Sequence, residues 1–204
     1  MAAKYGFSDV RETLVGDLKG AYPTKWEDFE AARVLGEDVF GSPKPHPNAV
    51  LNLFLEQSIK FALPFASYRA TLSGFLALVS DKPGTVLPRP ALASTVHGMG
   101  AMKRAITIGV YATVHGGDLG VCPDGSCVLN IGINSTEGRR DALNKVFQVM
   151  FKGSEADALS PPSLGGIVCT NCARRLEKTH LACRKEFVWD ALPALFGWGS
   201  WEAV

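Results

Sequence analysis

Four of the five cysteines in this 204-residue chain fall into two close pairs, and their spacing constrains the fold more than any other feature. Cys122 and Cys127 flank the turn-forming segment 123–125, and Cys169 and Cys172 stand at the start of a predicted helix. Two such pairs that converge from separate parts of a fold make the closed four-thiolate site of a structural zinc ion. The sequence therefore predicts zinc knuckles at 122–127 and 169–172, with zinc tying the loop to the last helix.

An alternative set of ligands lies within residues 168–189, where His180 and Cys183 follow the second cysteine pair. On one continuous helix, Cys172 and His180 would lie about 12 Å apart along the axis. Zinc holds its ligand atoms only about 2.0–2.3 Å away, so these two side chains cannot share one ion on a straight helix. A mixed site with His180 or Cys183 in place of one thiolate, free thiols, and a redox pair at Cys169 and Cys172 remain as alternatives.

The residues around His180 and Cys183 also favour a place for both in the core. They belong to an apolar stripe at helical spacing, formed by Leu176, His180, Cys183, Phe187 and Ala191. The cationic residues of the segment mostly occupy the other faces of this helix: Arg174, Arg175, Lys178, Arg184 and Lys185. A cysteine or histidine on such a stripe is more often a packed core residue than a ligand.

The rest of the chain predicts a mainly α fold, with a single domain over residues 1–204 and about six to seven helices. Capping signals and apolar periodicity place these helices at 8–20, 24–36, 48–79 (two helices, or one kinked at Pro64), 91–114, from 134 through Met150, and 173–192. Three alternating prolines make 40–48 a stiff connector. A small β-hairpin is possible near residues 121–129.

Composition narrows the class of protein. Hydrophobic residues make up 47% and charged residues 20%, which is typical of a compact globular chain. The formal net charge of +1 gives no positive field for a nucleic-acid binder. No apolar run is long enough to span a membrane, and the first residues lack an export signal. We expect an intracellular protein, cytoplasmic or nuclear, whose spaced cysteines favour metal binding over disulfides.

Several segments together resemble the region that follows the BTB/POZ domain in BTB domain-containing proteins of mushroom-forming (basidiomycete) fungi. The residues that carry this resemblance are 42–54, 61–70, the two cysteine pairs, and 188–202. The resemblance implies a helical domain with two cysteine pairs and implies no catalytic activity. The BTB domain itself has no counterpart in these 204 residues, so its dimerisation and cullin-adaptor functions are not carried over.

No familiar catalytic motif occurs, but one histidine-rich segment is a weak candidate. His115 and Asp118 could act as a base and the carboxylate that orients it, and His97 could approach them from the preceding helix. A structural role is the more common fate for each histidine. At the end of the chain, Trp189, Trp198 and Trp201 favour packing on the domain over a partner-binding groove.

Two functions follow from these features. The first is a zinc-stabilised helical protein-interaction module of BTB-related origin, with a protein as partner. The second is a small intracellular enzyme built on the same scaffold, with His115, Asp118 and His97 in a pocket among the central helices. The sequence names no small-molecule substrate.

Overall fold

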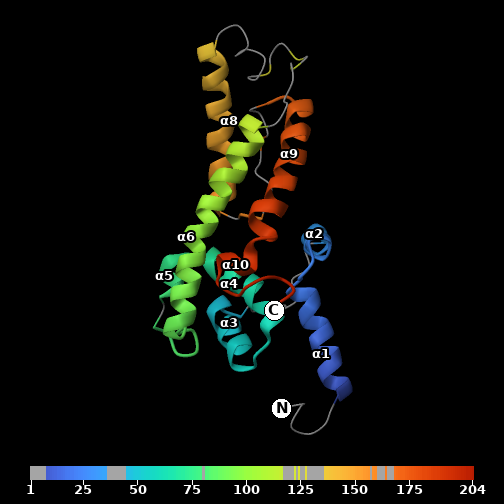
Figure 1. The fold of residues 1–204 in the computed structure, drawn as a ribbon, viewed down its shortest axis with the longest axis vertical. Coiled ribbons are helices and arrows are strands. Elements are labelled where there is room, and N and C mark those ends of the chain that lie inside the picture. Colours follow the sequence, from blue (N-terminus) through green and yellow to red (C-terminus); the bar gives the residue numbers. More distant parts are fainter. Residues whose placement is uncertain are drawn as a thin grey trace. The chain divides into compact units, whose positions relative to one another are not determined.

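The computed structural model describes residues 8–35, 45–79, 81–116, 136–156 and 168–204, together with residues 122, 124, 127, 158, 159 and 164. Within these residues the chain is mainly α-helical and contains no strand, which confirms the predicted fold class (Figure 1). The α-helices are α1 (Ser8–Ala21), α2 (Trp26–Leu35), α3 (Pro47–Glu56), α4 (Leu63–Leu72), α5 (Phe75–Leu78), α6 (Arg89–Tyr111), α8 (Thr136–Ala156), α9 (Thr170–Arg184) and α10 (Leu192–Leu195). Most of residues 121–129, where a hairpin was possible, lies outside the described part.

Within the described part of the chain, there are more helices than predicted because two of them are single turns. Helices α5 and α10 have four residues each, and such short elements leave no periodic signal in a sequence. The structure also contains π-helical turns at Ala112–Gly116, directly after α6, and at Lys185–Trp189, directly after α9. No helix among the described residues is long and apolar enough to cross a membrane.

The chain forms two compact units. Unit 1 comprises residues 1–99 and 192–204, and unit 2 comprises residues 100–191. The chain passes from one unit to the other within α6 and again between Ala191 and Leu192. The sequence shows no boundary at either point, and the single domain over 1–204 stays a prediction.

The core of unit 1 is built around α3 and α4, with α10 packed on α4 (Figure 1). Aromatic side chains dominate it: the rings of Tyr22 and Phe54 meet edge to face with centroids 4.7 Å apart, and Phe65 stacks on Tyr68. Trp198 donates a hydrogen bond from its Nε1 to the Oγ of Ser67, over 3.0 Å. The favoured interpretation of this tryptophan, packing on the domain, is therefore confirmed.

A buried asparagine connects α3 to the loop that carries α5. The Asn48 side chain is fully buried, and its Nδ2 lies 2.9, 3.3 and 3.1 Å from the carbonyl oxygens of Ala77, Leu78 and Thr85. His46 caps the same helix, because its Nδ1 accepts a hydrogen bond from the backbone N–H of Asn48. His46 is thus the N-cap residue of α3.

The break in the apolar segment 48–79 falls before Pro64. Helix α3 ends at Glu56, Ser58 adopts a positive φ of 53°, and a short 3-10 turn at Lys60–Ala62 leads into α4. Pro64 then lies in the first turn of α4, where its missing N–H costs no hydrogen bond. The two-helix alternative is confirmed, and the kink at Pro64 is wrong.

In unit 2, α8 and α9 both contact the π-helical turn at Ala112–Gly116 that follows α6 (Figure 1). The buried apolar residues of this unit include Val110 of α6, Val146 and Met150 of α8, and Leu176 of α9. Gly109 of α6 faces α9 at ordinary packing distance, since a Cβ placed at this glycine would lie 3.7 Å from the Cβ of Cys183. The residues of the predicted stripe that lie on α9, which are Leu176, His180 and Cys183, are all buried.

One cationic residue of α9 contradicts the predicted pattern. Arg184 is buried, although the sequence places it among the residues on the outer faces of the helix. Its guanidinium donates to the backbone carbonyl of Leu159, which is also buried. Because this acceptor lies 25 residues away, the helical periodicity alone could not reveal it.

Replacing either of two glycines in α6 by alanine should change the free energy of unfolding in opposite directions. A Cβ at Gly98 would lie 2.1 Å from Cδ1 of Phe196, whose side chain is fully buried. The backbone carbonyl of Phe196 also accepts a hydrogen bond from Ser94. We expect Gly98→Ala to lower the free energy of unfolding by about 2–3 kcal/mol, because the ring has no room to retreat. A Cβ at Gly100 would meet nothing closer than 3.9 Å, so Gly100→Ala should raise it by about 0.5–1 kcal/mol. Urea unfolding of both variants tests this, and equal effects would contradict the close packing at Gly98.

The Asn48 contacts predict a second stability effect. In Asn48→Ala, carbonyl oxygens that are now bonded to Nδ2 lose their donor, so the free energy of unfolding should fall by about 2–4 kcal/mol. Asn52→Ala is the matched control, because Asn52 lies one turn later and donates a single exposed hydrogen bond to Val86. Equal losses in the two variants, measured by urea unfolding, would show that the buried amide has no special role.

Candidate metal centre

The two cysteine pairs are presented by different kinds of local structure. Cys169 is the N-cap residue of α9, with extended backbone angles, and Cys172 lies in the first turn of that helix. Residues three apart at a helix start lie on the same side, so both thiols can point the same way. In the other pair, the backbone N–H of Cys127 donates to the carbonyl of Asp124 over 3.1 Å, which closes a turn between the two cysteines.

The structure brings all four thiols into one group. Each Sγ atom of Cys122, Cys127, Cys169 and Cys172 lies within 4.8 Å of the other three, and Cys122 and Cys169 approach to 3.5 Å. A tetrahedral zinc with Zn–S bonds of about 2.3 Å would place its sulfur atoms about 3.8 Å apart. A disulfide would need about 2.05 Å, and all five cysteines are free thiols. The group can therefore hold a metal ion with little movement.

The group is shielded from water. Cys122, Cys127 and Cys172 are buried in a small cluster of their own, with Val168 and Cys169 packed against them. The backbone N–H of Cys169 also donates to the Sγ of Cys127 over 3.4 Å. Hydrogen bonds of this kind orient metal-binding thiolates and stabilise their charge.

The surroundings move the pKa values of these thiols in opposite directions. The backbone of Cys172 lowers the pKa of Cys169 to about 7, against the effect of burial. Burial raises the pKa of Cys122, and burial together with the neighbouring sulfurs raises that of Cys172. Four thiolates at this separation repel one another, so the group ionises fully only around a cation.

His180 and Cys183 do not belong to this group. Both are buried on α9, as predicted for core residues, and line a cavity of about 10 Å³ with Gly109 and Arg184. Burial, and secondarily the charge of Arg184, lowers the pKa of His180 to about 4. His180 is therefore neutral at physiological pH. Arg184 is the residue of this environment that the sequence did not predict.

The weak catalytic candidates are not brought together by the described residues. The side chain of His97 is exposed on α6, in unit 1. His115 lies in the π-helical turn of unit 2, and its side chain, like the whole of Asp118, falls outside the described part. Their predicted roles stay predictions.

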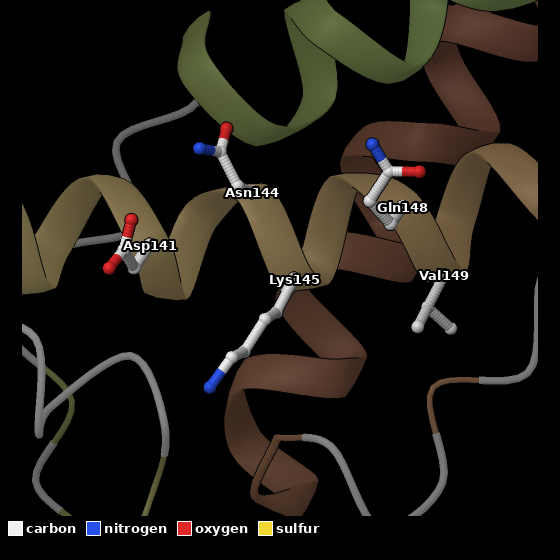
Figure 2. Close-up of a pocket in the computed structure, with 5 residues that line it drawn as sticks. All are labelled: Asp141, Asn144, Lys145, Gln148 and Val149. Carbon is white, nitrogen blue, oxygen red and sulfur yellow. The ribbon is translucent and has the colours of Figure 1, made fainter.

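A wider hollow lies against α8, with a volume of about 570 Å³. Figure 2 shows the side chains of the described residues that line it, Asp141, Asn144, Lys145, Gln148 and Val149, which all project from this one helix. The carboxamides of Asn144 and Gln148 extend to the same side of the helix. These lining residues include no cysteine or histidine, and they do not suggest a catalytic group.

Comparison with known proteins gives no relative to argue from: no family model, no curated protein and no solved structure matches this chain. The BTB-related origin expected from the sequence thus stays a prediction.

The environment of His180 predicts a pH dependence of stability. Its pKa is about 4 in the folded chain and about 6.5 when the group is unperturbed, so the unfolded chain takes up the proton first as the pH falls. Above pH 6.5 the residue has no effect, and between pH 6.5 and 4 it should reduce the free energy of unfolding by about 3 kcal/mol in all.

The comparison of His180→Gln with wild type isolates the contribution of His180 to the pH dependence of stability. The variant should show a shallower loss of stability across that range in urea titrations at several pH values. His97→Gln is the control for the loss of a histidine, because the side chain of His97 is exposed. Identical profiles for wild type and His180→Gln would mean that this histidine is not held neutral by burial.

Proposed function

We propose that this chain is a zinc-stabilised helical interaction module, in which one zinc ion joins the 122–127 loop to the start of α9. The observation that carries the proposal is the convergence of four thiols, from two separate parts of the chain, to within 4.8 Å of one another. Such convergence costs chain entropy and has no purpose in a core that ordinary apolar side chains could fill.

The donor set favours zinc among the metals. Four soft sulfur ligands in a tetrahedral arrangement select zinc or iron, whereas calcium and magnesium prefer oxygen ligands. With four thiolates bound, every position of a tetrahedral zinc is filled, so no water molecule can be activated there. The metal is therefore structural in this proposal, and it acts by holding two segments together.

The interaction role rests on a separate observation. Helix α5 exposes large apolar side chains, among them Leu76, which is 84% exposed. A surface of this kind is more typical of a binding site than of a bare protein exterior. The same proposal includes the BTB-related origin, for which the segments named above are the support.

Zinc content per chain tests the metal site. Wild type, purified without a metal-binding tag, should contain about one zinc by elemental analysis, and Cys122→Ser should lose most of it to a mild chelator, because one of four ligands is gone. Cys183→Ala is the matched control and should keep its zinc, since Cys183 is buried on α9 outside the thiol group.

Three results would contradict the proposal. Zinc retained in Cys122→Ser but lost in Cys183→Ala would transfer the site to the alternative ligands on α9. Iron in place of zinc would indicate a redox centre, and a metal-free wild type with all thiols titratable would leave the group without a metal. Circular dichroism of each variant verifies that the helices are still formed.

A further inference from the structure

Unit 1 carries a cluster of exposed apolar side chains centred on α5, which we call the α5 patch. Its members and their exposed fractions are Leu72 (42%), Phe75 (51%), Leu76 (84%), Val79 (44%) and Val86 (54%). They are neighbours in space, because Asn48 bonds to the backbone of α5 and of Thr85, while Asn52, one turn later on α3, bonds to Val86.

The fold holds these side chains outward on a rigid support. Leu78 is the inward anchor of α5 and is almost fully buried. Gly74, at a φ of 82° that suits glycine, reverses the chain between α4 and α5. The patch is therefore fixed before any partner arrives, and binding would cost little ordering of the backbone.

The size of the patch suits a modest specific interface. Its five side chains, at roughly 180 Å² each and just over half exposed on average, present on the order of 500 Å² of apolar surface. Two such patches face to face would bury about 1,000 Å², which is near the lower limit for a specific interface. A symmetric contact thus reaches this limit with no contribution from elsewhere on the chain.

The charges beside the patch are also self-complementary. Asp81 and Lys82 are adjacent and exposed, just after Val79. In a two-fold contact, an acidic and a basic group from one copy can face the basic and acidic groups of the other. A partner that carries charges of a single sign would be attracted by only one of these two side chains and repelled by the other.

We propose that the α5 patch is the dimerisation surface of this chain and that its occupant is a second copy in a two-fold arrangement. The inference names a partner for the interaction role proposed above and rests on that role. The patch contains none of the proposed metal ligands, because the thiol group lies in unit 2 and the patch in unit 1.

Sedimentation equilibrium of the full chain tests this directly. Wild type should form dimers within a concentration range that extends to about 0.5 mM. Leu76→Asp should raise the dimer dissociation constant at least tenfold, because it places a charge at the most exposed residue of the patch. Ile108→Asp is the matched control, because Ile108 is 55% exposed but lies in unit 2, and it should leave the constant unchanged.

Charge exchange separates a second copy from any other partner. Asp81→Lys and Lys82→Asp should each weaken the dimer about threefold or more, whereas the double exchange should restore it, because both copies then carry swapped but still complementary charges. Only a self-association is restored in this way.

Several outcomes would overturn the inference. If wild type stays monomeric throughout this concentration range, a second copy is not the occupant of the patch. The same conclusion holds if the monomer binds lipid vesicles or another protein through Leu76. A dimer that Leu76→Asp leaves intact means that another surface associates. Zinc analysis of the same samples distinguishes these results from a failure of the metal site, which would appear as lost zinc with dimerisation intact.

Discussion

The strongest constraint on this molecule is the mutual repulsion that four thiolates would experience in a small buried group. Thiols are tolerated in a core as weakly polar side chains, but four of them within 4.8 Å cannot all ionise without a cation. The position of Cys169 before α9 shows how the sequence prepares such a site. The N-terminus of a helix favours negative charge, and the backbone that starts α9 favours the thiolate form of Cys169.

Unit 1 is stabilised in a more ordinary way, by aromatic packing and one buried amide. Asn48 satisfies backbone carbonyls in a segment that is too short and irregular to satisfy its own. The position of α5 depends on these bonds, and so does the exposure of Phe75 and Leu76. A polar residue in the core thereby determines an apolar feature of the surface.

The sequence was most informative where one local pattern determined the result. Periodicity located the long helices, and the spacing of the two cysteine pairs anticipated the group that the structure brings together. Prediction from the sequence failed where a contact between residues far apart in the chain determines the local structure. Arg184 is buried because its guanidinium reaches the carbonyl of Leu159, and the single turns of α5 and α10 exist because tertiary contacts hold them. Pro64 begins a helix because Ser58 and the turn after it had already ended the preceding one.

The two units thus contain different kinds of functional feature. In unit 2, buried polar groups such as His180 and Arg184 accompany the thiol group, and stability there depends on protonation and, in our proposal, on a metal. In unit 1 the α5 patch needs neither. Because the chain passes between the units twice, local unfolding of unit 2 could still reach unit 1 through α6 or through the segment before α10. A change in self-association on removal of the metal would therefore measure the energetic coupling between the units, and its absence would show that the two features act independently.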